Sequence, residues 1–432
     1  MRSGFRLDHG DQGFGSIAVD VFPGAVGHSG VPDARMPRYD RFVGRSWLRH
    51  ILFASLLVVA ATNACAATWL VGPTHALKKP SEAARVARSG DTVLIESGLY
   101  EGDVAVWSQP RLTIAATGGP VVLRAAGASA EGKAIWVVRG VDVRIEGIVF
   151  EGARVAERNG AGIRHESGHL LVSRCVFRDN QMGLLTSNDG AVRLSIEDSL
   201  FEDSARSRDA FFHLLYAGRI ASLTVIGSRF RGGYNGHLLK SRAARTVLRY
   251  NMLADGPGGA ASYEAEFPNG GDVEMVGNIL SQSETGENPA IVSYGMEGIA
   301  WSTNRILLSR NTLHSAAPTV RFVHTADAGR GDGSFVLRME NNLFASPGPR
   351  PPDPADDRAG GNLWVPASDL RDPVAFDFRL RADAEAKASR SFLPGEAPLP
   401  TREFVWPAGT RALPGDGRRL PGAPANSSAP GG

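Results

Sequence analysis

The chain has 432 residues, of which 43% are hydrophobic and 21% are charged, and its formal net charge is +2. This is a globular composition, long enough for one large domain or two small ones. The near-neutral balance excludes global electrostatic attraction of nucleic acid, so no nucleic-acid partner is expected.

The N-terminal region, residues 1–66, is predicted to carry a secretory signal peptide. Its apolar run at 51–61 (ILFASLLVVAA) follows Arg45 and Arg49 and precedes small residues, which indicates cleavage after about Ala66. The run is shorter than the roughly 20 residues that a membrane span needs. We therefore expect a secreted or periplasmic protein with no stable membrane span after cleavage.

Two alternatives concern the same region. Met36 precedes a cluster of arginines and is a candidate for the true initiator, and Cys65 is a weaker candidate for lipidation. Cleavage after Ala66 removes 7 of the 47 basic and 5 of the 45 acidic residues, which leaves 40 of each. Cys175 is then the remaining cysteine, so we expect no internal disulfide. We also expect a monomer.

A short pattern of alternating apolar residues recurs at intervals of 23 to 33 residues, which predicts a repeat protein. Alternation with period two indicates strands. The pattern occurs as VRIEGIVF (143–150), LLVSRCVF (170–177), LSIEDSLF (194–201), LTVIGSRF (223–230), TVLRYNML (246–253), VEMVGNIL (273–280), ILLSRNTL (306–313) and VLRMENNLF (336–344). Strands stacked in parallel at roughly 4.8 Å, two or three to a turn, form a β-helix.

One position of the repeat, two residues before its last apolar residue, becomes asparagine in the later copies. It is occupied in order by Ile148, Cys175, Ser199, Ser228, Asn251, Asn278, Asn311 and Asn342. Stacked amides can hydrogen-bond along the axis, so we interpret the series as a structural ladder.

These repeats and the segment TWLVGPTHALKKPSEAARVARSGDTVLIESGLYEGDVAV (68–106) resemble proteins of the pectin-lyase-like superfamily. The resemblance implies an all-β fold, a single-stranded right-handed parallel β-helix over residues 67–345. A capping helix is expected at 81–88, with Ser81 as N-cap and Gly90 just past its end. Residues 346–408 are expected to pack on the last coil, with an extended strand within 372–390, and 409–432 to be a disordered tail.

Polar residues gather on the second strand of the middle repeats. Alternation predicts that Leu214, Leu238, Ala265 and Phe267 point inward. It predicts an outer face made by Tyr216, Lys240, Arg242, Glu264, Glu266, Tyr294, Glu297 and His324.

Lys240 is the central candidate because the chain has five lysines against 42 arginines. Unlike arginine, lysine can act as a base near neutral pH when it is desolvated or crowded by cations. This chemistry suits β-elimination from a uronic-acid polymer, with Lys240 as base and Arg242 or Arg245 as the clamp on the sugar carboxylate. The candidate acids are Tyr216, Tyr263 and Tyr294. The alternative is a structural ion pair of Lys240 with Glu264 or Glu266.

The stretch KSRAARTVLRYN (240–251) also resembles the lysine-serine motif of the chondroitinase B and alginate lyase family. That resemblance implies Lys240 as the base. The family's calcium ligands and acid do not carry over, because the upstream residues are Tyr234, Asn235 and His237, without a carboxylate.

Other residues of this region allow other chemistry. Glu264 and Glu266 could serve a glycoside hydrolase, or could bind Ca²⁺, the one candidate cofactor, together with Asn269. His213 and His237 precede equivalent Leu-Leu pairs and should touch, either as packing residues or as two ligands of a zinc site.

The sequence thus predicts a protein that acts on an acidic polysaccharide, with a lyase favoured. The rival is a non-catalytic polysaccharide-binding or envelope assembly protein that uses the same face.

Overall fold

The computed structural model describes residues 66–326, 335–348, 360–389, 392–413 and 420–423. The predicted signal peptide lies outside the described residues, apart from Ala66. None of the described helices is long and apolar enough to cross a membrane.

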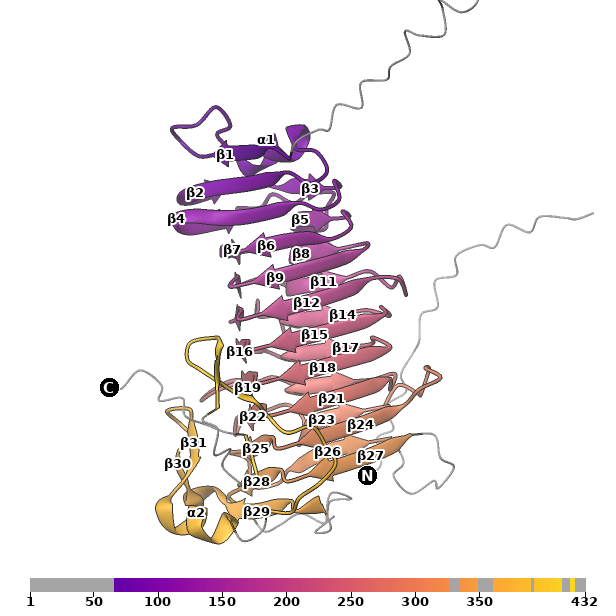
Figure 1. Ribbon diagram of the computed structural model, residues 1–432, viewed down its shortest axis with the longest axis vertical. Coiled ribbons are helices and arrows are strands. Elements are labelled where there is room, and N and C mark those ends of the chain that lie inside the picture. Colours follow the sequence, from indigo (N-terminus) through magenta and orange to yellow (C-terminus); the bar gives the residue numbers. More distant parts are fainter. Residues whose placement is uncertain (1–65, 327–334, 349–359, 390–391, 414–419, 424–432) are drawn as a thin grey trace, which may run out of the picture. The chain divides into compact units, whose positions relative to one another are not determined.

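The described chain winds as a parallel β-helix whose coils contribute strands to three series (Figure 1). This confirms the predicted all-β solenoid. The first series is β1 (Thr68–Val71), β2 (Thr92–Glu101), β4 (Thr113–Arg124), β6 (Val143–Glu146), β9 (His169–Ser173), β12 (Arg193–Glu197), β15 (Ser222–Ile226), β18 (Arg245–Arg249), β21 (Asp272–Val276), β24 (Arg305–Ser309) and β27 (Val336–Glu340).

The second series begins with the far halves of β2 and β4, because β4 pairs with both β6 and β7. It continues as β7 (Ile148–Glu151), β10 (Val176–Arg178), β13 (Leu200–Glu202), β16 (Arg229–Arg231), β19 (Met252–Ala254), β22 (Ile279–Gln282), β25 (Thr312–Ser315), β28 (Leu343–Ser346) and β29 (Leu363–Pro366).

The third series forms a separate sheet of nine strands. It contains β3 (Ala105–Trp107), β5 (Ala134–Val138), β8 (Ala161–His165), β11 (Met182–Thr186), β14 (Leu215–Ala217), β17 (Leu239–Ser241), β20 (Ala265–Phe267), β23 (Ala290–Tyr294) and β26 (Arg321–Thr325).

The last apolar residue of each repeat stacks in the core of the coil. Phe150, Phe177, Phe201 and Phe230 are in register in the second series and fully buried. Their rings are parallel, with centroids 5.1, 4.6 and 4.6 Å apart. Such pairs stabilise by about 0.5–1.5 kcal/mol beyond their buried area, so the repeat pattern identifies a continuous core row.

The predicted asparagine ladder is confirmed. Asn251, Asn278 and Asn311 are fully buried, and each side-chain amide donates to the side-chain oxygen of the asparagine one coil further on. The ladder reaches Asn342 and ends on Asn362, which lies beyond the predicted last coil. The asparagine side chains also provide hydrogen-bond partners for buried backbone groups at the turn between the first and second series.

The first coil is covered by helix α1 (Pro80–Val86), close to the predicted position. Its N-cap is Lys79 rather than Ser81, and the Lys79 side chain makes no capping hydrogen bond. The predicted cap is wrong because Pro80 begins the helix, where its fixed φ is already helical and its missing N–H costs nothing. The Ser81 N–H instead donates to Asp103, 3.0 Å away.

The end of the chain differs from its prediction in three ways. Strand β29 continues the second series past residue 345. The segment 372–390 contains a hairpin strand and a helix rather than one extended strand on the last coil. Residues 410–412 and 422–423 make backbone hydrogen bonds, so the predicted disorder from 409 is wrong for them.

The additional elements of this segment are β30 (Leu370–Asp372), β31 (Asp377–Leu380), β32 (Arg402–Phe404), β33 (Thr410–Ala412), the 3-10 helix η2 (Ala367–Asp369) and helix α2 (Ala382–Ala388). Their apolar side chains, such as Phe378, Leu380 and Phe404, pack against Met252, Ile279 and Leu343 of the second series. The C-terminal segment therefore packs on later strands of the second series, among them β19, β22 and β28 (Figure 1).

Candidate functional site

The third series presents one continuous outward row across the middle coils. Register aligns Leu185, Tyr216, Lys240, Glu266, Ser293 and His324 on consecutive strands from β11 to β26. The inward row consists of Leu184, Leu215, Leu239, Ala265, Val292 and Val323, all in the core. The prediction that Tyr216, Lys240, Glu266 and His324 share a face is confirmed.

Lys240 is held by two carboxylates. Its Nζ lies 2.8 Å from Glu266 Oε2 and 3.1 Å from Glu297 Oε1, and the side chain is 10% exposed. The second oxygen of Glu297 lies 2.6 Å from an Nη of Arg242. One exposed carboxylate, on the turn that follows β23, therefore bridges the two cations.

Arg242 also connects this pair to the rest of the row. Its Nε donates to the Tyr216 hydroxyl at 2.9 Å, and a terminal nitrogen donates to Asn269 Oδ1. Lys240 Nζ lies 5.8 Å from the centre of the Tyr216 ring. The structure thus brings five predicted site residues, Tyr216, Lys240, Arg242, Asn269 and Glu297, into contact.

Histidines form the inner wall of this cluster. The rings of His213 and His237 stack with centroids 4.6 Å apart, as predicted, and Tyr263 lies 5.0 Å from His237. His213 Nδ1 accepts the His237 backbone N–H at 2.9 Å, while His237 Nε2 lies 2.9 Å from Glu266 Oε2. One ring nitrogen of each histidine is therefore engaged within the protein.

The site keeps its carboxylates ionised. Burial alone would raise the pKa of Glu266, but His237 and Lys240 together lower it to about 2. Burial is likewise outweighed at Glu297, whose pKa is lowered by Arg242 and Lys240. Two cations and two carboxylates therefore balance, and the ion pair proposed between Lys240 and Glu266 as the alternative to a catalytic amine is present.

Glu264 does not belong to the outward face, contrary to the alternation argument. Its side chain is buried, at 1% exposed. It stands directly before Ala265 of the inward row, and the residues at the same position of the neighbouring coils are the buried Leu238 and Ile291. The chain bends at this corner before the strand begins, so two consecutive residues face the core. Burial and the charge of Asp255 raise the Glu264 pKa well above its ordinary value.

Two further predicted residues lie elsewhere. Tyr294 is fully buried and donates to the Gly271 carbonyl at 2.7 Å, because the register puts Ser293 rather than Tyr294 beside Glu266. Burial raises its pKa, and it cannot be the acid at this face. Arg245 begins β18 in the first series and pairs with Asp272, so it is not a clamp beside Lys240.

These placements separate Glu264 from Glu266, so the predicted hydrolase pair does not flank a common site. The same separation removes the predicted calcium ligand set with Asn269. Over the described ranges, no group of three or more His, Cys, Asp or Glu side chains is arranged to hold a metal ion.

Arg164 is a residue of the same face that the sequence argument passed over. It precedes Leu185 in the outward row and follows Val137. The aligned strand AGIRHE carried the signal, since its arginine stands at the position of Tyr216 and Lys240.

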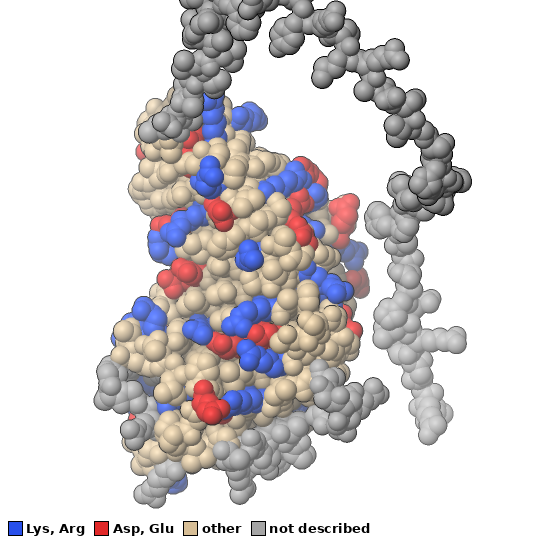
Figure 2. All heavy atoms as spheres, turned by 45° about the vertical axis from the view of Figure 1, so that its right-hand side comes forward, with Lys and Arg blue, Asp and Glu red and all other residues tan. Residues whose placement is uncertain are grey.

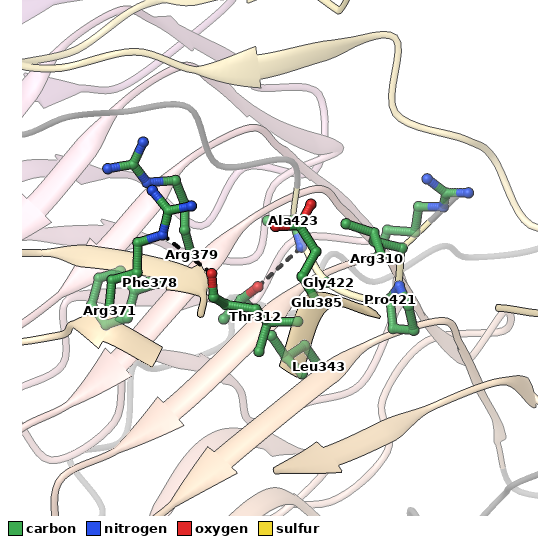
Figure 3. Close-up of a pocket in the computed structure, with 12 residues that line it drawn as sticks. Arg310, Thr312, Leu343, Arg371, Phe378, Arg379, Glu385, Pro421, Gly422 and Ala423 are labelled. Atoms are coloured by element: carbon green, nitrogen blue, oxygen red, sulfur yellow. Dashed lines mark hydrogen bonds between the residues drawn. The ribbon is translucent and has the colours of Figure 1, made fainter. Parts of the chain in front are cut away.

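A cavity of about 60 Å³ lies on another side of the coil, between β25 and β28 and the C-terminal segment. Figure 3 shows Arg310 on one side of it and Arg371 and Arg379 on the other. Ligand sites usually measure some 300 Å³ or more. The cavity is thus a packing gap at a seam rather than a sugar site.

Charges of both signs are interspersed on the side of the coil that Figure 2 brings forward. Recognition of an acidic ligand would therefore depend on local contacts, not on a broad field of one sign.

Comparisons with known proteins concern the fold. No protein-family model matches the chain, and no curated protein matches it. The solved structure of pectate lyase Pel9A is similar with a TM-score of 0.52 and 12% identity, over 73% of this chain and 90% of that one. A pectin methylesterase from Aspergillus niger aligns over 62% and 87% with 11% identity, and its TM-score of 0.26 carries no argument. The similarity to the pectate lyase structure concerns the fold, and the chain is a parallel β-helix.

Proposed function

We propose that this protein binds an acidic polysaccharide on the outward row of β14, β17 and β20, with Lys240 and Arg242 as the carboxylate-binding pair. The observation that carries the proposal is the position of Glu297. Its carboxylate bridges both cations from an exposed turn, at 3.1 Å from Lys240 and 2.6 Å from Arg242. A uronate carboxylate has the same charge and shape and could take this place by exchange.

The surroundings suit a sugar. Tyr216 is half-buried and lies beside the pair, Tyr263 is half-buried and lies against His237, and Asn269 adds an amide at the rim. Aromatic rings offer apolar faces to sugar rings, while the amide and the tyrosine hydroxyl offer hydrogen bonds. The signal-like sequence at 45–66 is consistent with export, which is part of the proposal.

The test is titration of polygalacturonate, alginate and neutral dextran by calorimetry. We expect binding of the uronate polymers only, weakened tenfold or more by Arg242→Ala, since a charged hydrogen bond contributes about 1.5–3 kcal/mol. Glu297→Gln should bind more tightly than the wild type, because the competing charge is gone. The matched control is Glu284→Gln, an exposed carboxylate for which no ion pair is found among the described residues. Equal binding by the Glu297 variant, or none by the wild type, would contradict the proposal.

A lyase is the second candidate, and one observation favours it. The amine of Lys240, the guanidinium of Arg242 and the hydroxyl of Tyr216 lie within the reach of one sugar. One contact argues against a lyase. The buried carboxylate of Glu266 lies 2.8 Å from the Lys240 amine, and a ligand that arrives from solvent does not displace this carboxylate.

The absorbance of the unsaturated product separates the two candidates. β-Elimination moves the proton α to the carboxylate to a base and releases the glycosidic oxygen, which leaves a double bond in the sugar. The binding proposal expects no product on any uronate polymer. Product formed by the wild type and lost in Lys240→Ala would establish the lyase instead.

A further inference from the structure

Arg164 is a half-buried cation for which the structure offers no partner. No hydrogen bond or ion pair joins its guanidinium to any residue in the described part of the chain, and its Nε is out of contact with solvent. It lies between Val137 and Leu185 in the outward row, and both of these side chains belong to a small apolar cluster on the same face.

The nearby carboxylates are already engaged. Glu166, two residues further along, lies 2.7 Å from Lys133 and 2.6 Å from Arg139. Arg139 also pairs with Glu131. Burial accordingly lowers the pKa of Arg164, although Glu166 acts in the opposite direction.

An unpaired cation on an apolar surface costs folding free energy, because lost hydration is not replaced. Its five donors in a planar fork match a carboxylate. The guanidinium is thus placed to receive an anionic group that the protein itself does not supply.

We propose that Arg164 binds a second carboxylate of the same polysaccharide chain that engages Lys240 and Arg242. The inference rests on the proposed function and specifies its ligand: an oligouronide that runs across the strands, along the stacking direction. Three strand steps separate β8 from β17, or roughly 14 Å at about 4.8 Å a step. The buried Leu185 and the half-buried Tyr216 occupy the two intervening positions, and the ring of Tyr216 offers apolar contact to the sugars between.

The test measures affinity against ligand length. A graded series of uronate oligosaccharides is titrated into the wild type and Arg164→Gln. The wild-type affinity should rise once an oligosaccharide is long enough to reach both cation sites. Arg164→Gln should lose this rise, about tenfold or more, and should bind the short members as the wild type does. Arg193→Gln is the control, because Arg193 is exposed on β12 and has no ion pair with any residue that the structure describes.

The outcomes separate the two proposals. If the wild type binds long oligosaccharides and Arg164→Gln binds them equally well, this inference is overturned and the proposed function stands. Absence of wild-type binding overturns both.

Melting without ligand tests for a purely structural role. If the unpaired Arg164 cation costs folding free energy, Arg164→Gln should melt at the same temperature as the wild type or higher. A lower one, with weaker binding at every length, would mean that Arg164 supports the fold and would overturn the inference.

Discussion

Glu264 has an ionisable side chain at a corner position that is occupied by leucine or isoleucine in neighbouring coils. It follows the same bend as Leu214 and Leu238, and its Oε2 is buried without a hydrogen-bond partner among the described residues. Burial, with the nearby Asp255, raises its pKa well above the ordinary 4.5. Between pH 4.5 and this raised pKa, the folded protein therefore keeps the carboxyl neutral while the unfolded chain ionises it.

The sign of the linkage follows from these two states. Stability from Glu264 is fully present below pH 4.5 and is lost as the pH rises towards the folded pKa, at about 1.4 kcal/mol per pH unit. Glu264→Gln cannot ionise. We expect it to melt a few degrees above the wild type at about pH 8, and to lose this advantage at about pH 4.5.

Thermal melting of both proteins across this range is the measurement. Glu284→Gln serves as the exposed control and should follow the wild type at every pH. A Glu264→Gln protein that melts lower at about pH 8 would show that the carboxylate is charged and partnered in the fold.

The asparagine ladder is the element that joins the coils at one corner. Asn278 accepts the backbone N–H of Asn251 at 3.0 Å and its side-chain amide at 3.0 Å, and it donates to the Leu248 carbonyl and to Asn311. Nearer the N-terminus the same position is Ser199, which receives one backbone N–H and donates to Glu197. The asparagines thus satisfy more buried groups than the serines do.

Asn278→Ala should therefore destabilise more than Ser199→Ala. It leaves several buried groups without partners, each costing about 1–3 kcal/mol, whereas the serine change leaves fewer. Urea unfolding of the two variants beside the wild type measures the difference. Equal losses of unfolding free energy in the two variants would mean that packing, rather than hydrogen bonding, is how the ladder stabilises the coil.

The repeat pattern predicted the coil because one physical requirement, a buried residue at each stacked position, recurs in every copy. It located the phenylalanine row, the ladder and the outward positions of Tyr216, Lys240 and Glu266. Alternation failed at Glu264 because a bend changes which residues face the core. It failed at Tyr294 because the register of the longer strand β23 could not be counted from the sequence. Arg164 was passed over because a missing partner is a property of the folded surroundings.

At the scale of the whole molecule, three buried histidines among the described residues are held neutral in the fold. Burial lowers the pKa of His165 and of His314 to about 4, and lowers that of His213 well below 6.5. Each therefore stabilises the fold fully above pH 6.5, and this stability is lost as the pH falls towards the folded pKa. The buried carboxyls Glu264 and Asp255 act in the opposite direction, because burial raises the pKa of both. The pKa of Asp255 is raised to about 6.

Each of these histidines contributes a loss of up to about 1.4 kcal/mol per pH unit as the pH falls from 6.5 to about 5, and the carboxyls whose pKa is raised, Asp198 among them, offset part of that loss. The melting temperature should fall over this interval. His314→Gln should make the slope shallower, whatever it does to stability at neutral pH, because it removes one of the histidines that the unfolded chain protonates and the fold keeps neutral. His169→Gln, at a partly exposed position on β9, should keep the slope. A His314→Gln protein as acid-sensitive as the wild type would show that His314 does not contribute to the loss of stability in this window, and would contradict the prediction.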